Sequence, residues 1–355
     1  MMKKIGLILL LLIVFINTHA QQSFEKVDKW LGDNVASMGG RLMLVVYKDG
    51  KTIYSHSVNQ MNNKQRMLGT FIARRQGKTV DFDDFTETSK LQIASCSKWL
   101  SAALVMTFVD EGKLKLTDTV GRFLPVLSRN GKGAITISEC LSHMTAIQSP
   151  DLRENLREMR QLNSMDEAIA QIAQYPMEGT HGKVFRYSNT GLQIAGAVIE
   201  KISGKSFETL FAERIAKPLE MKNTDFGKGK VALPAGGASS SPNDYMNFLI
   251  MILNNGIFNG KRILSENSIA EMQVNRVTAD VKVAYSPTEA GTLSYGYGEW
   301  LMGNNIVSSP GLFGSFPWVN NVKKYCAFLM AFYLKSDGRQ KKYATLKKVV
   351  EEELN

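Results

Sequence analysis

Hydrophobic and polar positions give the two ends of the chain strand character. Residues 41–47 and 52–58 are rich in β-branched and aromatic residues, and the Asp49-Gly50 pair between them is typical of a two-residue hairpin turn. A short helix is expected before this hairpin. Further strands are expected at 293–302, 311–319 and 325–334. A charged helix is expected after them, at 339–353. The two ends therefore predict one shared antiparallel sheet.

The middle of the chain repeats its apolar residues at helical spacing. The segment from Ser95 to Gly112 is nearly apolar throughout and predicts a buried helix that Gly112 terminates. Further helices are expected at 192–202, 207–215 and 243–254. Residues 60–90 are polar and weakly periodic, which predicts a loop with at most one strand.

We therefore expect an α/β fold of the α+β kind in a single domain over residues 21–355. Its sheet would come from about 21–90 and 285–355, and a mostly helical subdomain from about 91–284.

The first 20 residues have the pattern of a secretory signal peptide. Lys3 and Lys4 precede an apolar run from Ile5 to Ile16, and small residues at 18–20 suit cleavage before Gln21. This run is shorter than the ~20 residues that a membrane-spanning helix needs, so a retained anchor is the less favoured interpretation. We expect an exported bacterial protein, periplasmic or secreted, with no stable membrane insertion after cleavage.

Composition narrows the function classes. Hydrophobic residues make up 44% of the chain and charged residues 21%, which suits a folded protein with a sizeable core. The formal net charge is +10, but the basic residues are scattered, which argues against a nucleic-acid-binding stripe and leaves attraction to an anionic cell wall or membrane open. Three cysteines, Cys96, Cys140 and Cys326, are odd in number and predict buried thiols instead of a disulfide framework.

One candidate for nucleophilic chemistry stands at the start of the buried helix. Ser95 and Lys98 are three residues apart, so they share a helix face. A serine hydroxyl needs a neighbouring base, and a partly desolvated lysine is a suitable partner. The helix N-terminus would direct backbone N–H groups at an acyl oxyanion. Ser97 is the next candidate nucleophile, and the alternative interpretation of the spacing is a solvated helix start.

A second candidate group follows at Tyr187-Ser188-Asn189, just ahead of the predicted helix at 192–202. A phenol beside cations ionises more easily than an isolated one, so Tyr187 is a plausible general base toward Ser95. Asn189 could orient Lys98 and a substrate carbonyl through its amide. The alternative interpretation is a structural tyrosine that caps a turn.

Taken together with their surroundings, these motifs resemble the serine β-lactamase-like hydrolases, a group with class C β-lactamases, D-alanyl-D-alanine carboxypeptidases, D-aminopeptidases and esterases. The resemblance extends over about residues 30–335 and is carried by the stretches 93–125, 135–147, 179–226 and 235–272. It implies an antiparallel sheet flanked by helices, a mostly helical subdomain, and an active site in the cleft between them.

The resemblance also implies roles for single residues. Ser95 matches the acylated nucleophile, Lys98 its partner, Tyr187 the acid/base tyrosine and Asn189 the amide of the second motif. In the family the third motif reads Lys-Thr-Gly, or begins with His and keeps the Gly.

In this chain the matching segment is Ser309-Pro310-Gly311, so the glycine is kept and the cation is lost. We expect Ser309 and Gly311 to contact substrate. The Leu312 N–H would form the oxyanion hole together with the Ser95 N–H. Without a cation at position 309, neutral acyl esters are expected to be better substrates than carboxylate-bearing ones.

Other polar residues are weaker candidates. Cys140 and His143 have the spacing of metal ligands, but there is no second cluster, so we expect neither a metal nor a cofactor. His181 precedes the tyrosine motif and is a candidate for substrate contact. Trp318 follows the third motif and is expected in the core.

Two functions remain as hypotheses. The first is a secreted serine hydrolase that acts through an acyl-enzyme on an ester or amide, with small molecules or cell-wall peptides as substrates. The second is a non-catalytic binding protein of the same fold, which the altered third motif would explain. The sequence does not distinguish ester, β-lactam and D-amino-acid peptide substrates, and it leaves the oligomeric state open.

Overall fold

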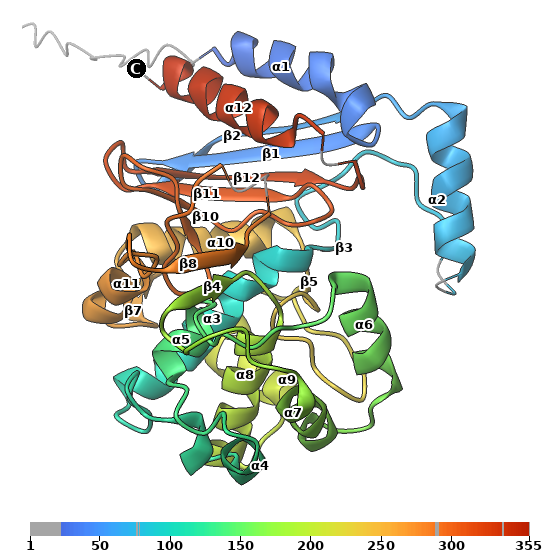
Figure 1. Ribbon diagram of the computed structural model, residues 1–355. Helices are drawn as coiled ribbons and strands as arrows, with labels where there is room; N and C mark the ends of the chain where they lie inside the picture. Colours follow the sequence, from blue (N-terminus) through green and yellow to red (C-terminus); the bar gives the residue numbers. More distant parts are fainter. Residues whose placement is uncertain (1–22, 76, 78, 288–290, 336, 355) are drawn as a thin grey trace, which may run out of the picture.

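The computed structural model describes residues 23–75, 77, 79–287, 291–335 and 337–354. The predicted signal peptide lies outside the described residues. A six-stranded sheet runs across the upper half of the molecule in Figure 1, in the order β2-β1-β12-β11-β10-β9, with every neighbouring pair antiparallel. Its strands are β1 (Arg41–Lys48), β2 (Lys51–Asn59), β9 (Trp300–Leu301), β10 (Ile306–Ser308), β11 (Phe316–Asn320) and β12 (Tyr325–Ala331).

The two ends of the chain meet in this sheet as predicted. Strand β1 pairs with β2 through the expected hairpin, in which Asp49 and Gly50 both have positive φ values of 50° and 81°. A two-residue turn with two positive φ angles matches the twist of the flanking strands. On its other side β1 pairs with β12, with Leu44 opposite Leu329. The predicted fold class is therefore confirmed.

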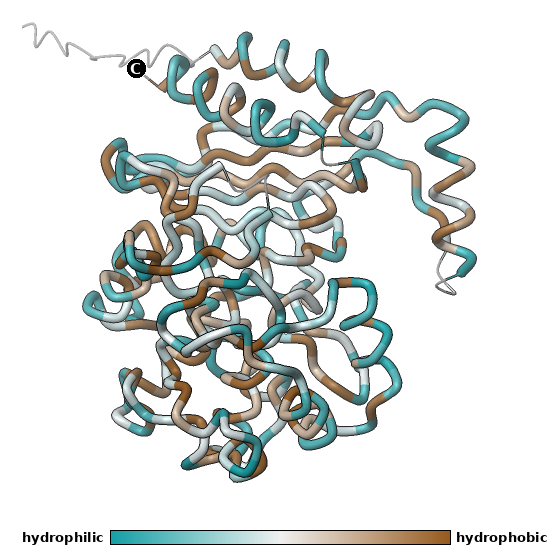
Figure 2. Tube along the Cα trace, in the orientation of Figure 1, coloured by the Kyte–Doolittle hydropathy of each residue, from teal (hydrophilic) through white to brown (hydrophobic). Residues whose placement is uncertain are grey.

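Alternation along the strands divides the apolar side chains between two cores. Leu42, Leu44 and Val46 of β1 point to the face covered by α1 and α12, whereas Met43 and Val45 point to the opposite face. Figure 2 shows the brown, apolar strands enclosed between this helix pair and the rest of the molecule. The second core extends from the sheet through α10 and α3 into the helical subdomain.

Helices make up most of the remaining structure, and α3 runs through its centre (Figure 1). The helices are α1 (Glu25–Val35), α2 (Asn63–Arg75), α3 (Ser97–Asp110), α4 (Pro125–Arg129), α5 (Ile137–Leu141), α6 (Leu152–Gln161), α7 (Met165–Gln174), α8 (Thr190–Ser203), α9 (Phe207–Phe211), α10 (Pro242–Leu253), α11 (Glu266–Met272) and α12 (Arg339–Glu353). Short 3-10 helices cover Ala36–Met38, Ala94–Cys96 and Val120–Arg122, and a π-helix covers Ala212–Ala216. Three small two-stranded sheets pair β3 (Leu91–Gln92) with β5 (Ser239–Ser240), β4 (Val184–Arg186) with β8 (Lys282–Tyr285), and β6 (Ile257–Phe258) with β7 (Lys261–Arg262).

Two sequence predictions were wrong in detail. The segment 60–90, predicted as a loop, contains helix α2, which buries none of its residues and therefore shows no apolar stripe. The strands predicted at 293–302 and 311–319 form in part, as β9 (Trp300–Leu301) and β11 (Phe316–Asn320), and most of the residues before each of them are bends, turns or irregular. A Cβ on Gly298 would lie 2.5 Å from the Lys98 carbonyl oxygen, so this segment packs closely against α3 as a loop.

All three cysteines are buried free thiols, as expected. Within the described part of the chain, no helix is long and apolar enough to cross a membrane.

Candidate active site

Ser95 stands where the chain enters the buried helix α3. It belongs to the 3-10 turn Ala94–Cys96, and Ala94 before it has a positive φ of 45°. Helix α3 is buried from Ser97 to Phe108, whereas Ser95 is partly exposed. Ser97, the alternative nucleophile, is fully buried, and its hydroxyl donates to the Ala94 carbonyl. The turn therefore leaves the Ser95 side chain accessible and buries that of Ser97.

Lys98 lies one helical turn from Ser95 and points at it. Its Nζ is 3.3 Å from Ser95 Oγ, 3.2 Å from Asn189 Oδ1 and 2.7 Å from the Ala235 carbonyl oxygen. The side chain is only 1% exposed, and burial lowers the pKa of Lys98 to about 7. A lysine in this state exchanges its proton near neutral pH, as a base for Ser95 must.

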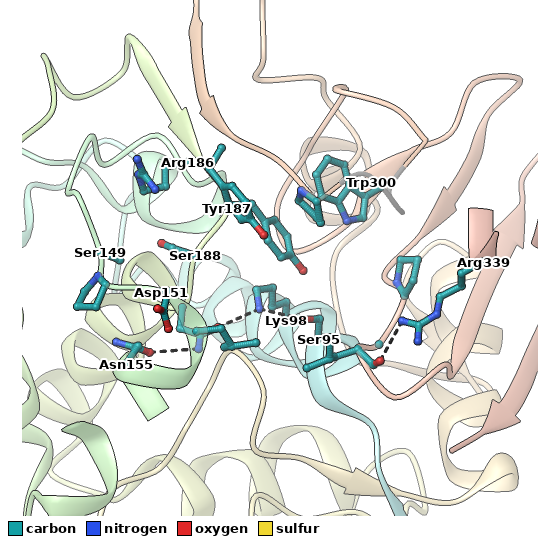
Figure 3. Close-up of a pocket in the computed structure, with 18 residues that line it drawn as sticks. Ser95, Lys98, Ser149, Asp151, Asn155, Arg186, Tyr187, Ser188, Trp300 and Arg339 are labelled. Carbon is teal, nitrogen blue, oxygen red and sulfur yellow. Dashed lines mark hydrogen bonds between the residues drawn. The ribbon is translucent and has the colours of Figure 1, made fainter. Parts of the chain in front are cut away.

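Tyr187 approaches Ser95 from the end of β4. Its ring stacks on Trp300 at 5.2 Å and covers Lys98 Nζ at 4.8 Å from the ring centroid. Figure 3 shows the phenol directed toward Ser95 and Lys98. Burial raises the pKa of Tyr187, so the phenol stays protonated at neutral pH. The expectation of an easily ionised Tyr187 was wrong, because the sequence does not show how far the ring is removed from water.

Asn189 is the N-cap residue of α8, but its side chain makes no capping hydrogen bond. The amide is used in the site instead. Its Oδ1 accepts from Lys98, and its Nδ2 donates to Asn155 Oδ1 at 3.2 Å. Asn155, from α6, was not a sequence candidate. The available signal was weak: an uncharged polar residue on the buried stripe that it shares with Met159 in an otherwise charged helix.

The third motif follows strand β10, and its residues divide into two groups. Gly311 and Leu312 line the cavity beside Ser95. A Cβ on Gly311 would lie 2.4 Å from the Ile93 carbonyl oxygen, so glycine is needed for the segment to approach the turn that carries Ser95.

Ser309 differs from the expectation. It is 1% exposed and does not line the cavity, because its hydroxyl lies 3.1 Å from the Ser95 carbonyl oxygen and 3.0 Å from that of Gly298. Ser309 therefore hydrogen-bonds the backbone next to the nucleophile, and the expectation that it contacts substrate was wrong.

A cavity of about 380 Å³ opens in front of Ser95 (Figure 3). Its walls are largely apolar and come from both the sheet and the helical subdomain. The lining includes Pro150, Leu152, Tyr285, Pro287, Trp300, Pro310 and Leu312.

Two arginines reach the cavity and were missed by sequence reasoning. Arg186 is paired with Glu178. Arg339 is 3% exposed and donates to the carbonyl oxygens of Leu312, Tyr333 and Lys335. It lies at the start of a charged helix, where an arginine is ordinarily solvated, so nothing in the sequence marks it.

The weaker candidates do not form sites. His143 is buried, its Nε2 is 3.1 Å from the Tyr295 hydroxyl, and burial lowers the His143 pKa well below its usual value. Among the residues that the structure describes, no group of histidines, cysteines and acids could hold a metal ion. His181 pairs with Glu139 and does not line the cavity. Trp318 is fully buried in the core, as expected.

The chain is similar to several known proteins. Residues 35–350 match the Beta-lactamase family. A candidate beta-lactamase from Bacteroides dorei DSM 17855 has a similar structure, with a TM-score of 0.77, 26% identity, and coverage of 94% of this chain and 99% of that one. A family VIII carboxylesterase shares the fold with a TM-score of 0.72 and 17% identity, covering 93% and 97% of the two chains.

Among curated proteins, Protein flp of Staphylococcus aureus (strain MW2) is 28% identical over 142 residues. The match spans 39% of this chain and only 28% of that protein. The family match covers most of the chain and the structural likeness covers nearly all of it, so the chain belongs to the beta-lactamase family.

Proposed function

We propose that this hydrolase cleaves an uncharged carboxylic ester, or a related amide, through an acyl-enzyme on Ser95. The observation that carries the proposal is the buried Lys98 ammonium, whose Nζ lies 3.3 Å from Ser95 Oγ and whose pKa falls to about 7. A serine with such a base beside it, at the edge of a cavity, is the arrangement that acyl transfer requires.

In the acylation step, neutral Lys98 takes the Ser95 proton through its nitrogen lone pair. The Oγ then attacks the substrate carbonyl carbon, and the carbonyl π electrons move to oxygen. The N–H groups of Ser95 and Leu312 would stabilise this oxyanion, because both residues line the cavity. The C–O or C–N bond of the leaving group breaks as the carbonyl re-forms.

Tyr187 would pass the proton to the leaving group. Its phenol is protonated at neutral pH, points toward Ser95 and covers Lys98, so it can donate a proton and regain one from the lysine. In deacylation the same groups act in reverse: a water loses its proton to the Tyr187–Lys98 pair, attacks the ester carbon, and Ser95 is released with its proton restored.

The cavity walls support an uncharged substrate. Prolines, aromatic rings and leucines form most of the lining. Of the charged groups on the lining besides Lys98, Arg186 is paired with Glu178, Arg339 is bound to backbone carbonyls, and Asp151 accepts the Glu154 N–H as the N-cap of α6. A neutral acyl or alcohol group can therefore be buried without leaving a charge unpaired. The esterase with the same fold is consistent with this choice, although its sequence identity is 17%.

Labelling with a fluorophosphonate tests the proposal. Oγ attack on phosphorus expels fluoride, and mass spectrometry of the tryptic peptide then locates the label. We expect it on Ser95, with loss of labelling and turnover in Ser95→Ala. Ser149→Ala, which alters a cavity serine whose hydroxyl is hydrogen-bonded to Thr190, should still be labelled on Ser95. No labelling, and no turnover of p-nitrophenyl esters, nitrocefin or D-alanyl dipeptides, would favour a non-catalytic binding protein.

Export is proposed from the sequence pattern of residues 1–20 alone. Amino-terminal sequencing of the protein from a bacterial periplasm tests it. A chain that begins at Gln21 is expected, and an intact leader on active cytoplasmic protein would contradict it.

A further inference from the structure

A residue outside all three motifs contacts the catalytic group. Asn155 lies on α6, is 5% exposed, and its Oδ1 accepts a hydrogen bond from Asn189 Nδ2 at 3.2 Å (Figure 3). Helix α6 otherwise buries only Met159. The buried Asn155 amide can therefore hold the Asn189 side chain in place.

Lys98, Asn189 and Asn155 form a series of hydrogen bonds, and the donor and acceptor in each bond follow from the group at the end of the series. An ammonium group only donates, so the Asn189 group that faces Lys98 Nζ must be the oxygen, at 3.2 Å. The Asn189 NH₂ group must then face Asn155, which has to present its own oxygen. This leaves the Asn155 NH₂ group on the opposite side of the amide.

That opposite side has a suitable acceptor. The Tyr175 phenol interacts with the Asn155 amide, and its hydroxyl donates to Glu158 Oε2. A carboxylate only accepts hydrogen bonds, so the Tyr175 hydroxyl must be the donor to Glu158. With Lys98 donating to the Asn189 oxygen, one orientation of the two amides satisfies both contacts, and Asn155 must present its oxygen to Asn189.

We propose that Asn155 is a positioning residue that locks the Asn189 amide with its oxygen toward Lys98, and so holds the Lys98 nitrogen over Ser95. This inference rests on the proposed function, because it assigns Asn155 a role through the base of the acylation step. Without Asn155, the Asn189 amide can rotate, and its NH₂ group would then face the Lys98 ammonium.

The groups around Lys98 make its protonation a clean reporter. The titratable groups that face it are the Cys96 thiol, the His143 imidazole and the Tyr187 phenol. Burial raises the pKa of Cys96 and Tyr187 and lowers that of His143, so all three are neutral near pH 7. A change in the pH dependence of Ser95 labelling therefore reports on Lys98.

Two substitutions of similar size separate positioning from simple packing. Asn155→Asp keeps the acceptor for Asn189 and adds a negative charge, so labelling should reach the wild-type plateau within about threefold, with its apparent pKa shifted upward. Asn155→Leu removes the acceptor, so the plateau rate should fall by about ten- to a hundredfold and the apparent pKa should move downward, because the ammonium loses an ordered partner. The readout is the second-order rate of fluorophosphonate labelling from pH 5 to 10.

Asn320 supplies the matched control. It is similarly buried at 3%, and its amide donates to Glu351, remote from the cavity. Asn320→Leu should lower the melting temperature and leave the labelling pH profile unchanged. Tyr175→Phe keeps Asn155 and removes the phenol that orients it, and a several-fold slower plateau is expected from a variant that retains the buried ring.

The outcomes distinguish this inference from the proposed function. A wild-type protein that is not labelled on Ser95 overturns the proposed function itself. If the wild type is labelled, and folded Asn155→Leu and Asn155→Asp shift the apparent pKa in the same direction or not at all, Asn155 does not position the base. Should Asn155→Leu fail to fold, the Asn155→Asp and Tyr175→Phe profiles decide the question, and wild-type profiles in both would overturn the inference.

Discussion

The Ser309 hydroxyl lies 3.1 Å from the carbonyl oxygen of Ser95, with almost no exposure to solvent. Ser309 follows strand β10 of the sheet, and Ser95 lies in the 3-10 turn that precedes the central helix α3. This contact therefore ties the backbone of the candidate nucleophile to the sheet. In the third motif of the family this position usually carries a cation. Here it carries a serine, whose hydroxyl hydrogen-bonds backbone carbonyl oxygens.

This relationship predicts how Ser309→Ala behaves. The variant loses one buried hydrogen bond, which contributes about 1 kcal/mol to stability, and frees the turn that holds Ser95. We expect a melting temperature lowered by a few degrees and a several-fold lower kcat, with KM for a neutral ester little changed.

Ser308→Ala is the matched control, because the neighbouring hydroxyl donates to the Pro317 carbonyl at 2.6 Å, within the sheet. It should cost similar stability and leave kcat unaltered. A raised KM with unchanged kcat in Ser309→Ala would instead mean that the serine contacts substrate.

The pH dependence of activity should follow Lys98. Burial lowers its pKa to about 7, and only the neutral amine can accept the Ser95 proton. We expect kcat/KM for a neutral ester to rise with pH through an apparent pKa near 7 and then to level off. Lys98→Arg, which stays charged, should be inactive throughout. A profile that is flat from pH 5 to 9 would argue against Lys98 as the base.

The same burial has a consequence for stability. Between pH 7 and about 10 the unfolded chain binds a proton at Lys98 that the folded protein does not, so wild-type stability rises with pH over this window. Lys98→Met lacks this slope. We expect it to be inactive but a few kcal/mol more stable than wild type at pH 6, with the difference shrinking toward pH 10. Urea unfolding at pH 6 and 9 measures this, and equal slopes in both proteins would contradict the buried, proton-releasing lysine.

The sequence predicted those features that depend on local spacing. The Asp49-Gly50 turn and the one-turn separation of Ser95 and Lys98 are properties of neighbouring residues, and both occur as expected. The pKa of Tyr187 and the burial of Ser309 depend on residues distant in sequence, such as Trp300 and Gly298, so local patterns misjudged them. Asn155 and Arg339 escaped notice because each lies in a helix whose other residues are largely charged and exposed.

Arg339 decides the last prediction, which concerns substrate charge. Arg339 is a cation that lines the cavity beside the third motif, where the family usually has a Lys or His. Its Nη1 donates to the Leu312 carbonyl at 2.9 Å. Its Nη2 donates to the carbonyls of Tyr333 and Lys335, and its Nε is buried. Among the described residues, three of the five N–H groups thus bind backbone carbonyls and Nε is buried without a partner, which leaves a single Nη1–H and no pair of N–H groups for a substrate carboxylate.

We therefore expect wild type to hydrolyse a neutral ester at least as well as a matched substrate that carries a free carboxylate away from the scissile bond. Arg339→Gln should lower kcat/KM for both by a similar factor, because it releases the Leu312 segment on which the oxyanion depends. Steady-state kinetics on the ester and acid pair measures this. If the loss were confined to the carboxylate substrate, and wild type preferred that substrate by tenfold or more, Arg339 would be a recognition group, and the guanidinium would have to exchange its backbone carbonyls for the substrate on binding.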